Sequence, residues 1–447
     1  MSAALHRSFA SLSVPNYRLY FGGQIVSLAG NWVQIVAELW LILALTGSGV
    51  AVGFATALQF SGILLFGAFG GALADRFDKR RLLILSQTGM AVPALILFAL
   101  TTTGAAEAWM VLVVIGLRGL VLAVDNPARQ SFVIEIVGPE RVVNAVGLNS
   151  VLIHSARVTG PAIAGVLIAV SGVALCFLLN ALSFVAMLVA LVRMKPGELA
   201  QPKREGRADR RGVRHALRYV LATPELRTPL LLMAALGTLG FNFQVIIPLL
   251  ADRTFGGAVS AYSLLMIAMG IGSIAGALTI GARAQASRGL IAAAALGFGV
   301  SALLAAAAPS LPLEMAALGV LGACSVTFAA GINSGLQLAA APEMRGRVMA
   351  LYSIVFLGST PLGGPLTGWI GEAVDPRATL VLAGAAGIGV AVAALAWWRR
   401  PLPPVEREGV SRACRSGPAR PALPSPRGSR SRRQARSPAG RAGRSAA

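Results

Sequence analysis

The stretch Gly67–Leu83, which reads GAFGGALADRFDKRRLL, indicates how the chain folds. It contains the end of one long apolar run, a short charged loop and the start of a second apolar run. A hydrophobic hairpin with a charged tip must leave that tip in water, and Lys and Arg in short loops favour the cytoplasmic side. The stretch therefore predicts two membrane-spanning helices that are joined in the cytoplasm. The charges lie on Asp75, Arg76, Asp78, Lys79, Arg80 and Arg81.

The composition agrees with a membrane protein. The chain has 447 residues, of which 55% are hydrophobic and 13% are charged. Soluble domains carry about 25% charged residues, and a span needs about 20 apolar residues. No apolar run shows the alternation of a barrel strand, so the spans must be helices that satisfy their own backbone. We expect an all-α membrane protein with twelve transmembrane helices, at 19–45, 51–73, 82–103, 108–125, 146–170, 172–192, 229–250, 260–282, 289–308, 311–336, 348–371 and 378–398.

The loop charges give the orientation. The connections after the first, third and fifth helices carry no Lys or Arg, and those after the seventh and eleventh carry one each, Arg253 and Arg377. The connections after the even-numbered helices are basic, so we expect both termini in the cytoplasm. The domains follow as a lead-in at 1–18, a six-helix bundle at 19–192, a basic linker at 193–228, a second six-helix bundle at 229–398 and a disordered Arg-rich tail at 399–447. Within the linker we expect a short amphipathic helix near Val213–Leu221.

The two bundles are predicted to be repeats of each other. Asn31-Trp32 parallels Asn242-Phe243, Asn126 and Gln130 parallel Asn333 and Gln337, and Gly160-Pro161 parallels Gly364-Pro365. Such matches in order at a near-constant offset indicate a six-helix pseudo-repeat, which is one transporter design with its site at the seam between the halves.

The charged loop resembles the loop between helices 2 and 3 of the major facilitator superfamily, in the residues Gly71, Asp75, Arg76, Lys79 and Arg80. The fifth apolar run is similar to the antiporter motif of drug-efflux members, in Gly147, Ala156, Gly160, Pro161 and Gly165. Segments 16–24, 30–34, 125–132 and 149–162 resemble the enterobactin-exporter-like branch. The resemblance covers about residues 9–398. It implies alternating access, proton-coupled export from a bacterial cytoplasm and a conformational gate at the charged loop, with Asp75 as its latch.

Polar groups inside the spans are costly and therefore mark the site. Glu38 is the one acid that we expect deep in a span, and it is either a proton carrier or a fixed partner of an arginine. Asn31, Gln34 and Glu38 recur on one helix face, which we expect to line the cavity. We expect no ionisable residue well inside a span of the second half. The other candidates are Arg118, His154 and Arg157 in the first half and Asn242, Gln244, Asn333 and Gln337 in the second.

For other residues we expect mainly structural roles. Asp125 and Arg129 are predicted to form a surface pair near the start of a cytoplasmic helix that Pro127 opens. Phe54, Phe60, Phe241 and Phe243 either line an apolar pocket or pack the bundle. Cys176, Cys324 and Cys414 lie far apart, which indicates neither a disulfide framework nor a metal site.

Three functions remain open from the sequence. The first is proton-coupled efflux of a small amphipathic or anionic molecule, siderophore-like or drug-like, by alternating access. The second is a proton-coupled nutrient symporter, and the third is a membrane sensor or scaffold read out by the basic tail. We expect no enzymatic activity, no bound metal and no cofactor, with the proton gradient as the energy source. The expected partners are a small-molecule substrate and the lipid bilayer, without specific nucleic acid, and the chain is expected to act as a monomer in the bacterial inner membrane.

Overall fold

The computed structural model describes residues 10–138, 140–199, 211–281, 287–341 and 344–398, and every regular element in this part of the chain is a helix. The predicted tail at 399–447 lies outside the described residues. After a short 3₁₀ turn, the first half contains six helices: α2 (Pro15–Thr46), α3 (Gly49–Arg76), α4 (Lys79–Thr102), α5 (Ala108–Val137), α6 (Val142–Ser171) and α7 (Val173–Arg193).

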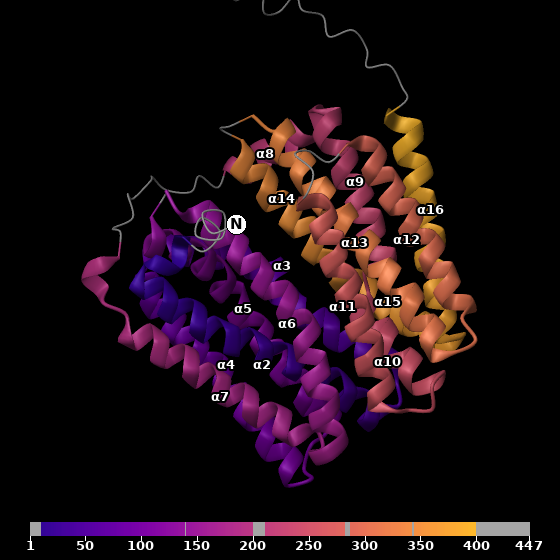
Figure 1. Cartoon of the computed structure of the whole chain (residues 1–447), viewed down its shortest axis with the longest axis horizontal. Helices are drawn as coiled ribbons and strands as arrows, with labels where there is room; N and C mark the ends of the chain where they lie inside the picture. Colours follow the sequence, from indigo (N-terminus) through magenta and orange to yellow (C-terminus); the bar gives the residue numbers. More distant parts are fainter. Residues whose placement is uncertain (1–9, 139, 200–210, 282–286, 342–343, 399–447) are drawn as a thin grey trace, which may run out of the picture. The chain divides into compact units, whose positions relative to one another are not determined.

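The linker forms α8 (Arg211–Ala222), which confirms the predicted short helix. The second half then contains α9 (Pro224–Leu239), α10 (Phe243–Arg253), α11 (Val259–Gly281), α12 (Arg288–Ala307), α13 (Leu311–Ala339), α14 (Arg345–Gly358), α15 (Thr360–Ala373) and α16 (Pro376–Trp398). Figure 1 shows the helices of the first half, indigo to magenta, and those of the second half, salmon to yellow, as two groups.

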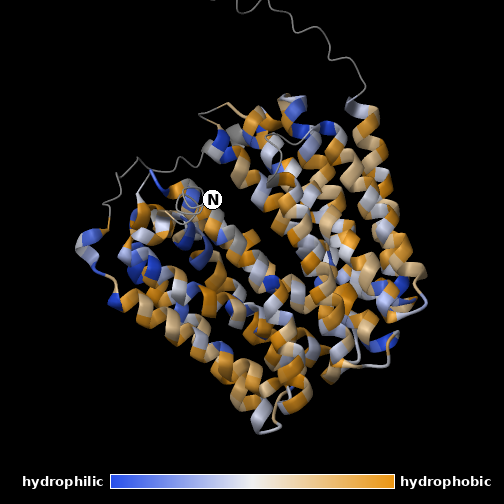
Figure 2. Ribbon diagram, viewed as in Figure 1, coloured by the Kyte–Doolittle hydropathy of each residue, from blue (hydrophilic) through white to orange (hydrophobic). Residues whose placement is uncertain are grey.

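Eleven described segments are long and apolar enough to cross a membrane, and the apolar part of α6, Ser155–Ser171, is a shorter twelfth. Hydrophobic residues run along the helices, whereas hydrophilic residues gather mainly near their ends (Figure 2). Large apolar side chains are exposed on the outside, for example Leu65 at 70% and Val170 at 80%. Such a surface is stable only in lipid, and the predicted all-α membrane fold is confirmed.

Local sequence fixes the ends of the helices in the hairpin that contains Gly67–Leu83. α3 ends at Arg76, and the carboxylate of Asp78 accepts a hydrogen bond from the backbone N–H of Arg81 at 2.8 Å. Asp78 is therefore the N-cap of α4, and an acidic cap stabilises the N-terminus of a helix. At the other end of α3, Ser48 is the N-cap and accepts from the N–H of Ala51.

Two spans that we expected to be continuous are broken. The seventh span, expected at 229–250, divides into α9 and α10 around Asn242, whose amide donates to the carbonyl of Thr238 in place of a backbone group. The eleventh, expected at 348–371, divides into α14 and α15 at Ser359. Pro361 lacks the N–H that would continue the helical bonding there. Broken helices in transporters expose backbone and side-chain polar groups at the substrate site.

The two halves touch mainly where α3 packs on α15 and where α6 packs on α11. Glycine allows the closest of these approaches, because a Cβ added at Gly53 would lie 2.4 Å from the carbonyl oxygen of Gly364. A Cβ added at Gly368 would lie 2.1 Å from the carbonyl oxygen of Gly49. The backbones of α3 and α15 are therefore in direct contact near the loop that joins α2 to α3.

Candidate functional site

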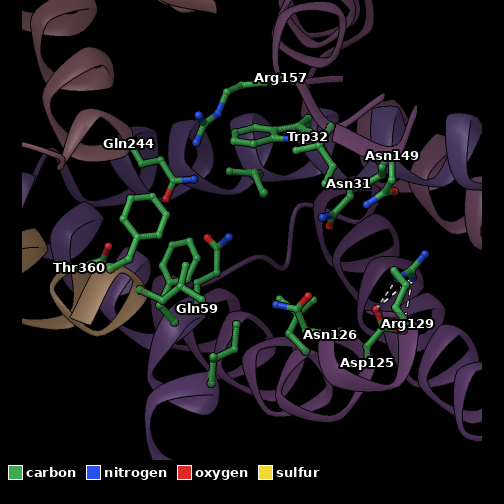
Figure 3. A pocket seen from close by; sticks show the side chains of 18 of the residues that line it. Asn31, Trp32, Gln59, Asp125, Asn126, Arg129, Asn149, Arg157, Gln244 and Thr360 are labelled. Atoms are coloured by element: carbon green, nitrogen blue, oxygen red, sulfur yellow. Dashed lines mark hydrogen bonds and ion pairs between the residues drawn. The ribbon is translucent and has the colours of Figure 1, made fainter. Parts of the chain in front are cut away.

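A cavity of about 470 Å³ lies between the two halves. The first half contributes all six helices, α2 to α7, to its wall, and the second half contributes the break between α9 and α10, together with α11, α13, α14 and α15. Aromatic side chains and amides lie among the lining residues (Figure 3), beside aliphatic and methionine side chains. The aromatic lining residues are Tyr20, Trp32, Phe60, Phe184, Phe241, Phe243 and Phe356, and the amides are Gln24, Asn31, Gln59, Asn126, Gln130, Asn149, Asn242 and Gln244.

Four of the predicted site residues line this cavity: Asn31 and Arg157 in the first half, and Asn242 and Gln244 in the second. The repeat pair Asn31-Trp32 and Asn242-Phe243 thus contributes to both walls. Of the four phenylalanines considered from the sequence, Phe60, Phe241 and Phe243 line the cavity, whereas Phe54 is half exposed and lies outside it.

Asn333 and Gln337 do not line the cavity, and their assignment to it was wrong. The last lining residue of α13 is Ala329, so these two amides lie one and two turns beyond the cavity. The Gln337 amide instead donates to Asn333 Oδ1 at 2.6 Å, and Gln337 is exposed. Their repeat partners, Asn126 and Gln130, do line the cavity, so the two walls are not equivalent.

A buried polar network lies behind the first-half wall. The guanidinium of Arg118 donates to Glu38 Oε2 at 2.6 Å and to Asn31 Oδ1 at 2.9 Å. Gln34 donates to Glu38 Oε1 at 2.6 Å and accepts a bond from the amide of Asn180 on α7. We call Asn31, Gln34, Glu38, Arg118 and Asn180 the buried network.

The polar stripe on α2 faces its neighbouring helices more than the cavity. Glu38 and Arg118 are 1% and 0% exposed, and neither they nor Gln34 are among the lining residues. The expectation that Gln34, Glu38 and Arg118 face the cavity was therefore wrong. A buried guanidinium needs a carboxylate and further acceptors, and α2 supplies these toward α5. Asn31 alone belongs to both the network and the cavity lining.

Asp125 is the carboxylate that the cavity does contain, and it was missed as a site residue. It is 4% exposed and accepts from Ser86 at 2.6 Å, from Gln87 at 2.9 Å and from Arg129 at 3.0 Å. The predicted surface pair is thus an ion pair between a buried carboxylate and a partly buried guanidinium. Pro127 lies inside α5 and opens no separate helix, because α5 continues to Val137 instead of ending at residue 125.

Arg157 is the second cation of the lining, and its surroundings differ from those of Arg129. Its guanidinium carbon lies 5.3 Å from the centre of the Trp32 ring. None of the ion pairs among the described residues includes it. The side chain of His154, one turn earlier on α6, lies outside the described side chains.

The small residues of α6 bring that helix close to both halves. A Cβ added at Gly160 would lie 2.3 Å from the Cβ of Trp32, and one at Gly165 would lie 2.0 Å from the hydroxyl oxygen of Ser263. Ala156 is buried and Pro161 lies inside the helix. The burial of Gly147 lies outside what the structure describes. The motif thus holds α6 against α2 and α11, as small residues do between membrane helices.

The charged loop makes its described contacts within the first half. Lys79 pairs with Glu135 at 2.5 Å, and Arg80 donates to the carbonyls of Leu191 and Val192 at the end of α7. Arg76 lies over the Phe77 ring, and a Cβ at Gly71 would meet nothing. The side chain of Asp75 lies outside the described side chains, so its predicted role as a latch stays a prediction.

Three polar side chains join the halves at the opposite end of α3. Glu372 of α15 accepts from the Ser48 hydroxyl at 2.6 Å and from the backbone N–H of Val50 at 3.0 Å. Arg253 of α10 donates to the carbonyl of Gly47 at 3.1 Å. We call Ser48, Arg253 and Glu372 the inter-half latch. α3 has 28 residues and is therefore about 42 Å long, so the latch and the charged loop lie at opposite ends of the spans.

Known proteins match the chain over most of its length. A family model described as "Transmembrane secretion effector" matches residues 6–425, which is further than residue 398, where we expected the resemblance to end. The chain is 27% identical over 266 residues to a staphyloferrin A transporter of Staphylococcus aureus. That alignment covers 59% of this chain and 66% of the transporter, just under two thirds. An enterobactin exporter of Shigella dysenteriae is 25% identical, with 85% of this chain and 90% of the exporter covered.

Solved structures give the same fold. The crystal structure of a D323A mutant of the nucleoside transporter NupG superposes with a TM-score of 0.67. It covers 86% of this chain and all of that chain, at 12% sequence identity. At that identity the likeness concerns the arrangement of the helices alone.

Proposed function

The chain belongs to the transmembrane secretion effector family of the major facilitator superfamily and is a multi-pass membrane transporter, and we propose that it exports a small amphipathic or anionic molecule in exchange for protons. One observation carries this proposal: a 470 Å³ cavity of aromatic and amide side chains lies between two helical halves that are joined by a latch at one end. A site at the seam of two repeats serves alternating access.

We propose that the transporter lies in the bacterial inner membrane with both termini in the cytoplasm, because the basic loops favour that side. The inter-half latch is then at the outer face. The halves at 19–192 and 229–398 rock against each other, and export requires the latch and the contact of α3 with α15 to separate in each cycle. The transporter works as a monomer, with no cofactor besides the proton gradient and no chemical change in its substrate.

The buried network is the proposed route of coupling. Both oxygens of Glu38 are occupied in this conformation, one by Arg118 and one by Gln34. Arg118 also donates to Asn31, which lines the cavity. Protonation of Glu38 removes the negative partner of Arg118, so the guanidinium must draw more strongly on Asn31. A proton at Glu38 thereby changes the hydrogen bonding of Asn31 in the cavity wall, although Glu38 itself does not line the cavity.

Glu38→Gln is expected to uncouple transport from the proton gradient, because an amide cannot exchange the proton. The measurement uses inverted vesicles with an imposed proton gradient and a panel of drug-like, siderophore and sugar compounds. The wild type should accumulate at least one compound, which identifies export. Glu38→Gln should lose gradient-driven accumulation at least about tenfold while it keeps gradient-independent exchange of the same compound.

The matched control is Glu107→Gln, which removes an exposed acid near the start of α5, outside the network. It should accumulate the compound as the wild type does. Equal gradient-driven flux in the wild type and in Glu38→Gln would remove Glu38 from the coupling role. Gradient-driven loss of the compound from the vesicles would indicate uptake into cells instead of export.

A further inference from the structure

We propose that Arg157 and Trp32 of the first half, together with Gln244 of the second, form a subsite for the anionic group of the substrate. The substrate class that follows is an aromatic monoanion. This inference rests on the proposed transport function and adds to it the charge and the orientation of the substrate.

The charge balance of the cavity wall favours an anion. Three lining residues are charged, Asp125, Arg129 and Arg157, and all three belong to the first half. Asp125 and Arg129 neutralise each other at 3.0 Å. The carboxylate of Asp125 is further engaged by Ser86 and Gln87, so it has little capacity left for a cationic substrate. One positive charge, that of Arg157, remains to be balanced by whatever the cavity holds.

The position of Arg157 is set by Trp32. Trp32 is held by α6 itself, because Gly160 lets the Trp32 Cβ approach that helix closely. The guanidinium lies over the fixed Trp32 ring, which orients it by cation–π attraction. A cation–π contact uses none of the N–H groups of the guanidinium as hydrogen-bond donors to an acceptor atom, so these groups can bind a carboxylate or sulfonate with two parallel bonds.

The opposite wall supplies a neutral donor. Gln244, on the first turn of α10, points into the same part of the cavity as Arg157 and Trp32, whereas Asp125 and Arg129 lie in another part (Figure 3). The lining residues of the second half include no ionisable side chain among those described. An anion at Arg157 therefore meets a cation from one half and an amide from the other, and it contacts both halves at once.

Aromatic side chains make the rest of the subsite suitable for a flat ring. Phe241 lies at the break between α9 and α10, with ring centres 6.0 Å from Phe243 and 6.4 Å from Phe356. All three line the cavity, as does Phe60 of α3. Ring contacts of this kind favour an aromatic guest, and a cavity of about 470 Å³ is within the range for a drug-sized ligand.

Calorimetric titration of the full-length transporter in lipid nanodiscs tests the subsite with two probes, naphthalene-2-sulfonate and its neutral analogue naphthalene-2-sulfonamide. The wild type should bind the anion at least about tenfold more tightly, as expected for a charge-assisted bidentate contact. Arg157→Gln should abolish this preference, because it should weaken binding of the sulfonate and leave binding of the sulfonamide unchanged. Arg157→Lys should keep part of it, because a point charge replaces the planar fork.

The matched control is Arg227→Gln. The guanidinium of Arg227 also lies over a tryptophan ring, that of Trp397 at 5.5 Å, but neither residue lines the cavity, so the preference for the anion should persist. A wild type that binds both probes equally overturns the inference, as does an Arg157→Gln variant that keeps the preference. If Arg157→Gln does not fold, the sulfonate preference of the wild type and of Arg157→Lys tests the subsite. Anion preference without gradient-driven transport contradicts only the proposed function, and export without anion preference contradicts only the subsite.

Discussion

Arg118→Met is expected to destabilise the transporter by about 3–5 kcal/mol, the usual effect of removing one partner of a buried ion pair. The reason is the burial of Glu38, which is 1% exposed and would lose its only ion-pair partner among the described residues. Asn31 would lose its donor as well. The measurement is the thermal unfolding of the purified protein in one detergent, where the apparent melting temperature should fall by several degrees.

The double variant Glu38→Gln/Arg118→Met separates the charge from the packing. With no charge left in the network, most of the lost stability should return, since replacing a buried pair is often close to neutral. If the double variant is as unstable as Arg118→Met, then packing of the long Arg118 side chain stabilises the fold and the pair does not. The control Arg253→Met leaves the buried network intact and should change the melting temperature less.

The fold could be predicted from the sequence because membrane constraints are strong and local. Gly67–Leu83 contains a charged tip between two apolar runs, and the same rule applied to every loop places each span. The pairing of Glu38 with Arg118 was also accessible, since a buried arginine has few acceptable partners. The position of this pair behind the cavity wall could not be predicted. Helical spacing shows that residues share a face of a helix, but it does not show which neighbouring helix that face contacts.

The features that were missed depend on contacts between distant segments. The length of an apolar run does not reveal the break at Asn242, since the Asn242 amide satisfies the Thr238 carbonyl there. Asp125 was placed at the surface because span four was ended at residue 125, whereas α5 continues to Val137. Glu314, in the first turn of α13, is buried at 0% exposure and was not considered from the sequence.

These findings place two different polar regions on one helix. Asn31 and Trp32 are adjacent on α2. Asn31 accepts a hydrogen bond from Arg118 of the buried network, whereas the ring of Trp32 contacts the guanidinium of Arg157, which lines the cavity. A change of protonation at Glu38 and the arrival of an anion at Arg157 therefore act on neighbouring residues of the same turn. This adjacency gives a physical basis for the proposed coupling of proton and substrate, in which the two need not share a carboxylate.

Gly53→Val is expected to reduce transport at least about tenfold by preventing closure of the latch end. The added Cβ would lie 2.4 Å from the Gly364 carbonyl oxygen and 2.9 Å from the Pro365 Cα, and backbone cannot rotate away as a side chain can. Overpacking of this kind costs about 1–3 kcal/mol. It acts only on the conformation in which α3 touches α15, so it shifts the population toward the other conformation by about 5- to 150-fold.

The population shift is measurable apart from transport. A cysteine introduced at Gln244, in the cavity wall, should react with a membrane-impermeant maleimide from outside intact cells much faster in Gly53→Val than without it. Gly389→Val is the matched control, since a Cβ at Gly389 of α16 meets nothing within 4 Å. In that variant the cysteine at position 244 should still be labelled slowly. Unchanged labelling together with normal flux would show that α3 and α15 need not be in contact during the cycle. Slow labelling together with lost transport would instead indicate that the valine locks the halves together, which is the opposite of the expected direction.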